Sequence, residues 1–374
     1  MNDNNFVKLG DVAHECRLTW SGEQTNIPIV GLEHLIPGEI ELSSWDSNIE
    51  HTFSKKFTKG QVLLGRRRVY LKKAVVAPCD GICSGDITVI ESTGGILPEL
   101  LPFVIQNDRF FDYAMQGSAG SLSPRVKWEH LKNYEFSLPP LAEQKVLAEK
   151  LWAAYRLKES YKKLLVATEE MVKSQFIEMF GNQDVNEKGW NESFVKDEFT
   201  LTMGKTPARN NPAYWQPGTN KWISISDMAN YGRYTSNTQE TITDIAVSES
   251  GIKLVPKGTI IMSFKLSIGR TAITSEDIYT NEAIMAFGDV DMSKFNIAFL
   301  QFLIANKNWL LNAKQAVKGH TLNKESIGNA KIIVPPIELQ ERFATIYDQA
   351  DKSGFELRKS IDAIDAVIKS LINS

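Results

Sequence analysis

The most constraining feature of the chain is a short proline motif that occurs twice. It reads Leu138-Pro139-Pro140-Leu141-Ala142-Glu143-Gln144 near the middle and Val334-Pro335-Pro336-Ile337-Glu338-Leu339-Gln340 near the end. Each copy closes a segment of strand and turn patterns and opens a segment with helical periodicity. Because proline fixes φ and lacks an amide hydrogen, a Pro-Pro pair is a favourable start for a helix. The repeat therefore predicts two similar modules, each followed by a similar helix.

The two helical segments are expected to be long and to pair with each other. Neither Pro nor Gly interrupts residues 141–180, and about 40 residues make a helix of about 60 Å. Apolar residues recur there at spacings of three and four, with Lys158 among the interruptions, and residues 337–374 step in the same way past Gly354. An apolar stripe on so long a helix needs a partner, so we predict an antiparallel pair. The alternative is two separate surface helices.

The expected fold class is α+β, with two pseudo-repeated mixed α/β domains separated by a pair of long antiparallel coiled-coil helices. The predicted segments are 1–138 for the first domain, 139–185 for the first helix, 186–334 for the second domain and 335–374 for the second helix. Duplication is also indicated by Lys257-Gly258-Thr259-Ile260-Ile261, which aligns with Lys59-Gly60-Gln61-Val62-Leu63, 198 residues earlier. Strands are predicted at 61–65 and 87–90, and a short helix at 99–116.

Composition limits the class of protein. Hydrophobic residues at 43% and charged residues at 23% are ordinary for a globular chain. No apolar run approaches the roughly 18 residues of a membrane span, and the start of the chain lacks the pattern of a signal peptide. We therefore expect a cytoplasmic protein without a membrane partner. Cys16, Cys79 and Cys83 agree with a reducing compartment. Cys79 and Cys83 are too far apart for a redox pair and too few for a closed zinc site, so buried small residues are the favoured interpretation.

The charge distribution points to nucleic acid. The net charge of −3 argues weakly against a general nucleic-acid binder. However, the windows 52–73, 199–226, 250–275 and 292–324 contain basic residues and no acid. Such windows predict basic faces on the two domains, and these faces can neutralise backbone phosphates.

Several stretches together resemble the specificity subunit of Type I restriction–modification enzymes. Besides the proline motifs, they are Gly204-Lys205-Thr206-Pro207 with Tyr214-Trp215 and residues 221–227, the stretch 65–74 with 80–84, and residues 267–270 with 280–283. The resemblance covers nearly the whole chain. It implies two target-recognition domains held apart by a helical pair. It also implies a non-catalytic subunit that reads double-stranded DNA while separate modification and restriction subunits carry out the chemistry.

The basic windows and the resemblance together give candidate DNA contacts. Arg and Lys suit guanine edges as well as phosphates. In a strand, Arg67 would face away from Arg66 and Arg68, and a solvated charge run is the plain alternative. Trp215 and Trp222 suit either a groove or the core, and the core is favoured for Trp222. The candidates are Lys55, Lys56, Arg66, Arg67, Arg68, Lys72, Lys73, Lys205, Thr206, Arg209, Tyr214, Trp215, Lys265, Arg270, Lys318 and His320.

The resemblance also implies protein partners. In the family the helices dock modification (methyltransferase) subunits, two by the internal repeat, and restriction or translocation subunits where a system has them. Residues Arg66-Arg67-Arg68 align with Phe264-Lys265-Leu266, so the two domains should read different sequences. We therefore expect an asymmetric, bipartite target, with domains about 34 Å or a multiple of it apart. Docking is expected on the outer helix faces at Glu143, Gln144, Lys145, Gln340 and Glu341.

Other functions fit the sequence less well. Asn211-Pro212-Ala213-Tyr214 resembles the Asn-Pro-Pro-Tyr motif of adenine methyltransferases, but Ala replaces the second Pro and no glycine-rich cofactor loop accompanies it. There is no phosphate-binding loop for ATP and no helical His pair for a metal. We therefore predict no catalytic residue, cofactor or metal. The rival from another class is a coiled-coil scaffold that binds only protein, which explains the helices but not the basic windows.

Overall fold

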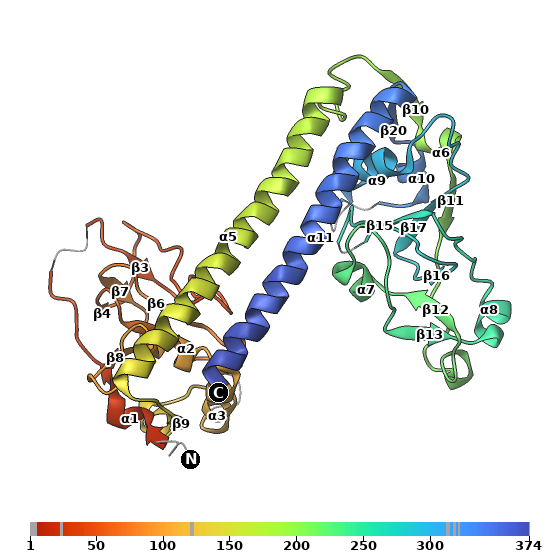
Figure 1. Ribbon diagram of the computed structural model, residues 1–374. Coiled ribbons are helices and arrows are strands. Elements are labelled where there is room, and N and C mark those ends of the chain that lie inside the picture. The colour runs from red at the N-terminus through yellow and green to blue at the C-terminus, as the bar shows by residue number, and fades with distance from the viewer. Residues whose placement is uncertain are drawn as a thin grey trace. The chain divides into compact units, whose positions relative to one another are not determined.

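The computed structural model describes residues 6–22, 25–119, 123–265, 267–311, 315–316, 319–320 and 322–373. The chain divides into two compact units (Figure 1). Unit 1 comprises Met1–Lys163 with Arg358–Ser374, and unit 2 comprises Leu164–Leu357. Each unit thus contains one mixed α/β part and a portion of each long helix. Unit 1 is therefore built from two segments that are separated in the sequence by unit 2. No helix in the described part of the chain is long and apolar enough to cross a membrane.

The two predicted long helices are confirmed as α5 (Leu141–Phe180) and α11 (Ile337–Asn373) (Figure 1). In unit 1 the early part of α5 meets the late part of α11, where Lys158 Nζ donates to Asp365 Oδ1 at 2.6 Å. In unit 2 the late part of α5 meets the early part of α11, where the Phe176 and Phe343 rings pack edge to face at 5.3 Å. These opposite pairings make the two helices antiparallel, as expected.

Unit 1 is built on a four-stranded antiparallel sheet in the order β2-β8-β5-β6. The predicted helix at 99–116 is two helices, because Asn107 caps the second one by accepting from Arg109 N at 3.0 Å. The strands are β1 (Phe6–Lys8), β2 (Ala13–Cys16), β3 (Ile29–Val30), β4 (Lys55–Phe57), β5 (Val62–Gly65), β6 (Ala74–Val76), β7 (Gly81–Cys83), β8 (Ile87–Ser92) and β9 (Glu135–Ser137). The helices are α1 (Leu9–Val12), η1 (Val69–Leu71), α2 (Leu101–Ile105), α3 (Asp108–Gln116) and α4 (Trp128–Leu131).

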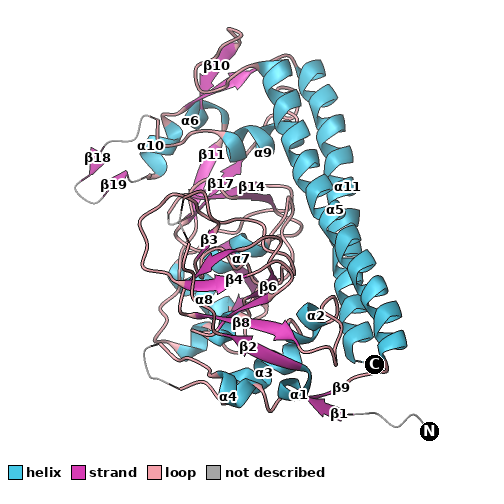
Figure 2. Cartoon of the chain, turned by 90° about the vertical axis from the view of Figure 1, so that its left-hand side faces the viewer, coloured by secondary structure: helices cyan, strands magenta, loops and turns pink. Residues whose placement is uncertain are grey.

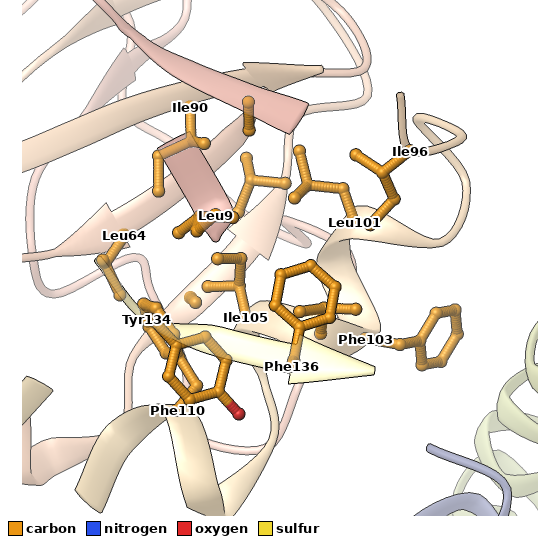
Figure 3. Packing of buried hydrophobic residues seen from close by; sticks show 14 of the residues in the cluster. Leu9, Leu64, Ile90, Ile96, Leu101, Phe103, Ile105, Phe110, Tyr134 and Phe136 are labelled. Carbon is orange, nitrogen blue, oxygen red and sulfur yellow. The ribbon is translucent and has the colours of Figure 1, made fainter. Parts of the chain in front are cut away.

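The main core of unit 1 lies between the sheet, α2 and β9, where the labelled side chains of Figure 3 converge. Leu9, Leu64 and Ile105 are fully buried there. Phe103 extends toward α5, and its ring lies 5.2 Å from that of Trp152. Because burying one such side chain stabilises the fold by about 1.5–3 kcal/mol, this contact attaches α5 to α2 of unit 1.

Unit 2 repeats this topology, with a four-stranded sheet in the order β11-β17-β14-β15. Gly60 and Gly258 precede the matching strands β5 and β14 and share a left-handed φ of 88° and 82°, which supports the duplication. The strands are β10 (Asn191–Phe194), β11 (Thr200–Met203), β12 (Asn220–Ile223), β13 (Glu240–Ile242), β14 (Ile260–Ser263), β15 (Thr271–Ile273), β16 (Tyr279–Thr280), β17 (Ile284–Gly288), β18 (Gln315–Ala316), β19 (Gly319–His320) and β20 (Lys331–Val334). The helices are α6 (Val195–Glu198), η2 (Pro212–Tyr214), α7 (Ile225–Asn230), α8 (Asp244–Ser250), α9 (Ile297–Asn306) and α10 (Lys324–Gly328).

The repeated proline motif has the same structural role in both units. Gln144 Nε2 donates to the carbonyl of Pro139 at 2.9 Å, and its Oε1 accepts from Leu97 N at 2.9 Å. Gln340 Nε2 donates to the carbonyl of Pro335 at 2.8 Å, and its Oε1 accepts from Asn296 N at 3.0 Å. Each glutamine therefore ties the first turn of a long helix to a loop of its own globular part.

Candidate nucleic-acid interface

The arginine run of unit 1 leaves the sheet instead of continuing it. β5 ends at Gly65, and Arg68 has a left-handed backbone (φ 53°) at the start of η1. Its N–H donates to the carbonyl of Pro124 at 2.8 Å, and Arg66 accepts from Val126 N at 3.0 Å. The expectation of strand alternation through the run is therefore wrong, because the run lies in a turn that pairs with residues 124–126.

Arg67 and Arg125 converge on one carboxylate. Arg125 Nε donates to Asp86 Oδ1 at 2.7 Å, and Arg67 Nη1 lies 3.5 Å from Asp86 Oδ2. The hydrogen bond from Arg125 holds the pKa of Asp86 below its ordinary value, with the charges of Arg67 and Arg66 adding to the effect. The single carboxylate of Asp86 thus faces three guanidinium groups, which leaves an excess of positive charge around it.

A polar cavity of about 600 Å³ opens beside this cluster. Arg66 lines it, and its Nε is buried without a hydrogen-bond partner among the described residues. Arg66 as a whole is half-buried, and a guanidinium at the wall of a polar cavity is a favourable donor to a phosphate or a base edge. The other lining residues are Glu15, Arg17, Leu18, Thr19, Thr52, Phe53, Ser54, Lys55, Gly85, Lys127, Trp128 and Glu129.

The predicted lysines of unit 1 have different surroundings. Lys55 lines the cavity, although its Nζ also donates to Ile87 O at 2.7 Å. Lys56 Nζ lies 5.7 Å from the Trp20 ring centroid. Lys72 donates to Asp108 at 2.6 Å and Lys73 to Leu32 O at 2.6 Å. Because contacts within unit 1 already engage these last two ammonium groups, we leave both out of the surface proposed below.

Sequence reasoning missed Arg17, Arg125 and Lys127. Arg17 lies just beyond β2 and lines the cavity, as does Lys127. The sequence could have indicated Arg125 and Lys127, since residues 113–128 form a further window without acidic residues. That segment pairs with the arginine turn through an Arg67–Arg125 bridge. The tertiary structure thus brings two basic windows together on one surface.

The predicted contacts of unit 2 gather in the loop between β11 and β12. Gly204 is required there, because a Cβ atom would lie 2.2 Å from Thr280 O. Lys205 donates to Ser250 O, and its own carbonyl accepts from Trp222 Nε1 at 3.0 Å. Thr206 donates to Glu282. These contacts hold the loop against the three-stranded sheet of unit 2, whose strands follow the order β13-β12-β16.

Arg209 forms the centre of an aromatic cluster in this loop. Its guanidinium lies 3.9 Å from the Trp215 ring centroid and 4.9 Å from that of Trp222, and it pairs with Glu240. Trp222 is 1% exposed, which confirms that it belongs to the core. Tyr214 donates to Glu249 at 2.7 Å, and this hydrogen bond raises the pKa of Tyr214. Several of these basic and aromatic groups thus already have partners within unit 2.

The remaining candidates of unit 2 are less closely grouped. Lys265 and Arg270 are exposed on the segment between β14 and β15. His320 lies in β19, whose side chains are outside the described residues, and Lys318 lies outside them altogether.

An acid-free window in the sequence is not acid-free in space. Glu240 reaches Arg209, Glu276 pairs with Lys221, and Asp86 reaches Arg67. Each acid comes from a different part of the chain than the base that it meets. The windows therefore overestimate the positive charge in both units, since Glu15 and Glu129 likewise pair with Arg17 at the cavity beside Arg66.

Two of the predicted docking residues are corrected by the structure. Gln144 is 1% exposed and Gln340 is 0% exposed, and their amides bond within their own units. Neither can offer a surface to a partner. Glu143, Lys145 and Glu341 are exposed and remain candidates.

The methyltransferase-like motif is used for local structure. Asn211 Oδ1 accepts from Ala213 N at 3.1 Å and so caps η2. Tyr214 bonds Glu249 instead of standing free for stacking on a base. The motif is therefore a capped turn, which argues against the methyltransferase interpretation.

Comparison with known proteins gives the class. Residues 187–364 match the family model described as the Type I restriction modification DNA specificity domain. The Type I restriction enzyme MjaIX specificity subunit of Methanocaldococcus jannaschii is 26% identical over 210 residues, or 54% of this chain and 48% of that protein. The HindI specificity subunit of Haemophilus influenzae is 22% identical over 194 residues, or 50% of this chain and 41% of that protein.

A solved structure shows the same fold over the whole chain. The S subunit of a Type I restriction–modification system from M. genitalium superposes with a TM-score of 0.59 at 11% identity, over 100% of this chain and 96% of that one.

Residues 187–364 thus carry the Type I restriction modification DNA specificity domain, and the chain is similar to specificity subunits of Type I restriction enzymes. Its matched part spans about half the length of the first two curated relatives. Specificity subunits are non-catalytic components of their enzymes, in agreement with the prediction that this chain is not itself an enzyme.

Proposed function

We propose that the chain binds double-stranded DNA and directs separate modification subunits to an asymmetric, bipartite target. The observation that carries the proposal is the cluster of Arg66, Arg67 and Arg125 around Asp86, beside a polar cavity that Arg66 lines. Such a surface suits phosphates and guanine edges. The matched DNA specificity domain supports DNA as the ligand.

The asymmetry of the target is argued from the difference between the units. Around Arg66, unit 1 has three guanidinium groups facing one carboxylate, whereas the unit 2 loop places Arg209 between Trp215 and Glu240. Surfaces of such different chemistry cannot read the same base pairs. Mapping methylated positions in DNA from cells that carry the system tests this. We expect two unlike short sequences with a fixed spacer, and a contiguous or palindromic target would contradict the proposal.

DNA affinity gives a direct test of the arginine cluster. We expect Arg66→Ala and Arg125→Ala to weaken binding by the full chain with its modification subunits. If each residue contacts a phosphate, each change should reduce the slope of log K against log salt by about 0.9. Lys150→Ala is the control, because Lys150 is exposed on α5 away from the cluster. Unchanged affinity and slope in both arginine variants would remove this surface from the DNA interface.

We propose that exposed faces of the long helices dock the modification subunits. Leu157, Leu164 and Met171 are 46%, 52% and 43% exposed and recur every seven residues on α5, so they share one helix face. An exposed apolar row of this kind favours a protein partner. Leu164→Glu should abolish co-purification of the modification subunit, whereas Lys163→Glu beside it should not. Charge reversal at Glu143, Lys145 or Glu341 should weaken assembly by a smaller factor.

The rival interpretation, a protein-binding scaffold without DNA contact, makes the opposite prediction for DNA. A scaffold would bind the modification subunits through the same helix face, yet the Arg66→Ala and Arg125→Ala complexes would retain the DNA affinity of the modification subunit alone. The salt-dependent binding assay therefore separates the two interpretations.

A further inference from the structure

Three potential metal ligands meet on the four-stranded sheet of unit 1, outside the arginine surface. His14 and Cys16 lie two residues apart on the edge strand β2, so their side chains share one face of the sheet. Glu91 lies opposite His14 on the neighbouring strand β8, and Figure 2 shows the two strands side by side. Cys16 Sγ lies 3.1 Å from Glu91 Oε2 and 3.7 Å from His14 Nε2, and the nitrogen lies 4.0 Å from that oxygen. One thiol, one imidazole and one carboxylate thus surround a single point.

We propose that His14, Cys16 and Glu91 form a binding site for a zinc-type divalent cation. Thiolate, imidazole and carboxylate are the ligands that Zn²⁺ takes, at about 2.0–2.3 Å. In a tetrahedral site these bond lengths place sulfur about 3.6 Å from each other ligand atom, and nitrogen about 3.4 Å from oxygen. Each observed separation lies within about 0.6 Å of these values, and the half-exposed ends of His14 and Glu91 allow that adjustment.

A buried amide orients two of the three ligands. Gln61 is 5% exposed, and its Nε2 donates to Cys16 Sγ at 3.4 Å and to Glu91 Oε2 at 3.1 Å. Its own Oε1 accepts from Thr58 N at 2.8 Å, which fixes the orientation of the amide. Outer partners of this kind hold metal ligands in place. On binding, the thiol proton is released to solvent and water takes the fourth position on the exposed side.

The fold itself does not require this set of side chains. In unit 2, the strand register places Thr200, Thr202 and Gly288 at the positions of His14, Cys16 and Glu91. None of these residues offers a thiol, an imidazole or a carboxylate. The same sheet therefore forms without the cluster, and the proposed site belongs to unit 1.

A second group of potential ligands is less suitable. Glu33, His34 and Asp46 also lie close together, but Gly31 N donates to His34 Nδ1 at 2.9 Å. That hydrogen bond leaves the proton of a neutral imidazole on Nε2, the nitrogen that faces Asp46. His34 thus donates to the carboxylate, and this group carries no metal proposal.

Cobalt titration of the full chain, after removal of bound metal by a chelator, tests the proposed site. We expect one equivalent of Co²⁺ to give the near-ultraviolet absorption of a cobalt–thiolate bond, and Zn²⁺ to displace it. Cys16→Ser should abolish the band. Cys79→Ser is the matched control and should keep it, because Cys79 lies outside the cluster. Gln61→Met should weaken the affinity about 10–100-fold.

His14→Ala keeps the test decisive should the buried Cys16 variant fail to fold, since the His14 side chain is 53% exposed. It should weaken cobalt affinity by more than the Gln61 variant does. A wild-type chain without the band, a band that persists in Cys16→Ser, or unchanged affinity in His14→Ala would each overturn the proposal. None of these outcomes depends on whether the chain binds DNA.

Discussion

The two buried glutamines of the proline motif should control the stability of separate parts of the chain. Gln144 makes three hydrogen bonds, accepting from Leu97 N and donating to the carbonyls of Gly95 and Pro139. Gln144→Met keeps the length of the side chain but leaves the half-buried Leu97 N–H without its partner. An unsatisfied buried group costs about 1–3 kcal/mol, and two carbonyls add a smaller amount, so we expect a loss of about 2–4 kcal/mol.

Hydrogen exchange read by mass spectrometry measures this loss region by region. A loss of 2–4 kcal/mol corresponds to exchange that is about 30- to 900-fold faster wherever opening involves the affected part. Gln144→Met should accelerate exchange in β5 and β8 of unit 1 and leave β14 and β17 of unit 2 near their wild-type rates. Gln340→Met should do the reverse, because Gln340 bonds Asn296 N, Lys294 O and Pro335 O within unit 2.

Glu143→Gln is the matched control, because it changes the exposed neighbour of Gln144 and should leave exchange unaltered. The reasoning would be refuted if Gln144→Met destabilised unit 1 by less than about 0.5 kcal/mol, the effect of an ordinary surface change. It would equally be refuted if either variant accelerated exchange uniformly across both units.

Three further predictions concern stability. Gly204→Ala should cost about 1–3 kcal/mol, because the new Cβ meets Thr280 O, whereas Gly232→Ala, which faces open space, should stay within about 0.5 kcal/mol in thermal melting. Asp365→Ala should destabilise the chain more than Lys158→Met does. Asp365→Ala leaves the ammonium group of Lys158, whose side chain is 11% exposed, without its partner, whereas Lys158→Met extends the apolar stripe of α5. Equal losses of stability in denaturant melts would contradict this. The pKa of Asp86 is lowered from 3.8 by its hydrogen bond to Arg125, so its stabilising effect is present above pH 3.8 and is lost as pH falls through the lower folded-state value. Arg125→Ala should therefore flatten the acid side of the stability profile, and an unchanged profile would show that the pair contributes nothing.

Local patterns in the sequence predicted the elements that local patterns control. The positions of α5 and α11 follow from helical periodicity after a proline pair, since the interacting side chains are three or four residues apart. The strands predicted at 61–65 and 87–90 follow from short apolar runs between turn residues in the same way, and the structure has them at 62–65 and 87–92. The duplication was visible because the two copies keep the same turn glycines and the same helix start.

The same patterns failed where the outcome depends on distant residues. The proline motif marked both helix starts, but nothing along the chain showed that Gln144 would meet a loop 47 residues earlier and become buried. The acid-free windows located the arginine turn, but they could not show that acids from elsewhere would neutralise part of the charge, or that residues 124–126 would join the turn.

The sequence by itself thus determined the class of elements, their order and their repetition, because these are encoded by neighbours within one or two turns. Tertiary structure alone decided which polar groups are buried, which cations keep free donors, and that Cys16 faces a carboxylate 75 residues away. The physical reason is that such contacts depend on strand pairing and register between segments far apart in the chain, which no short-range periodicity specifies.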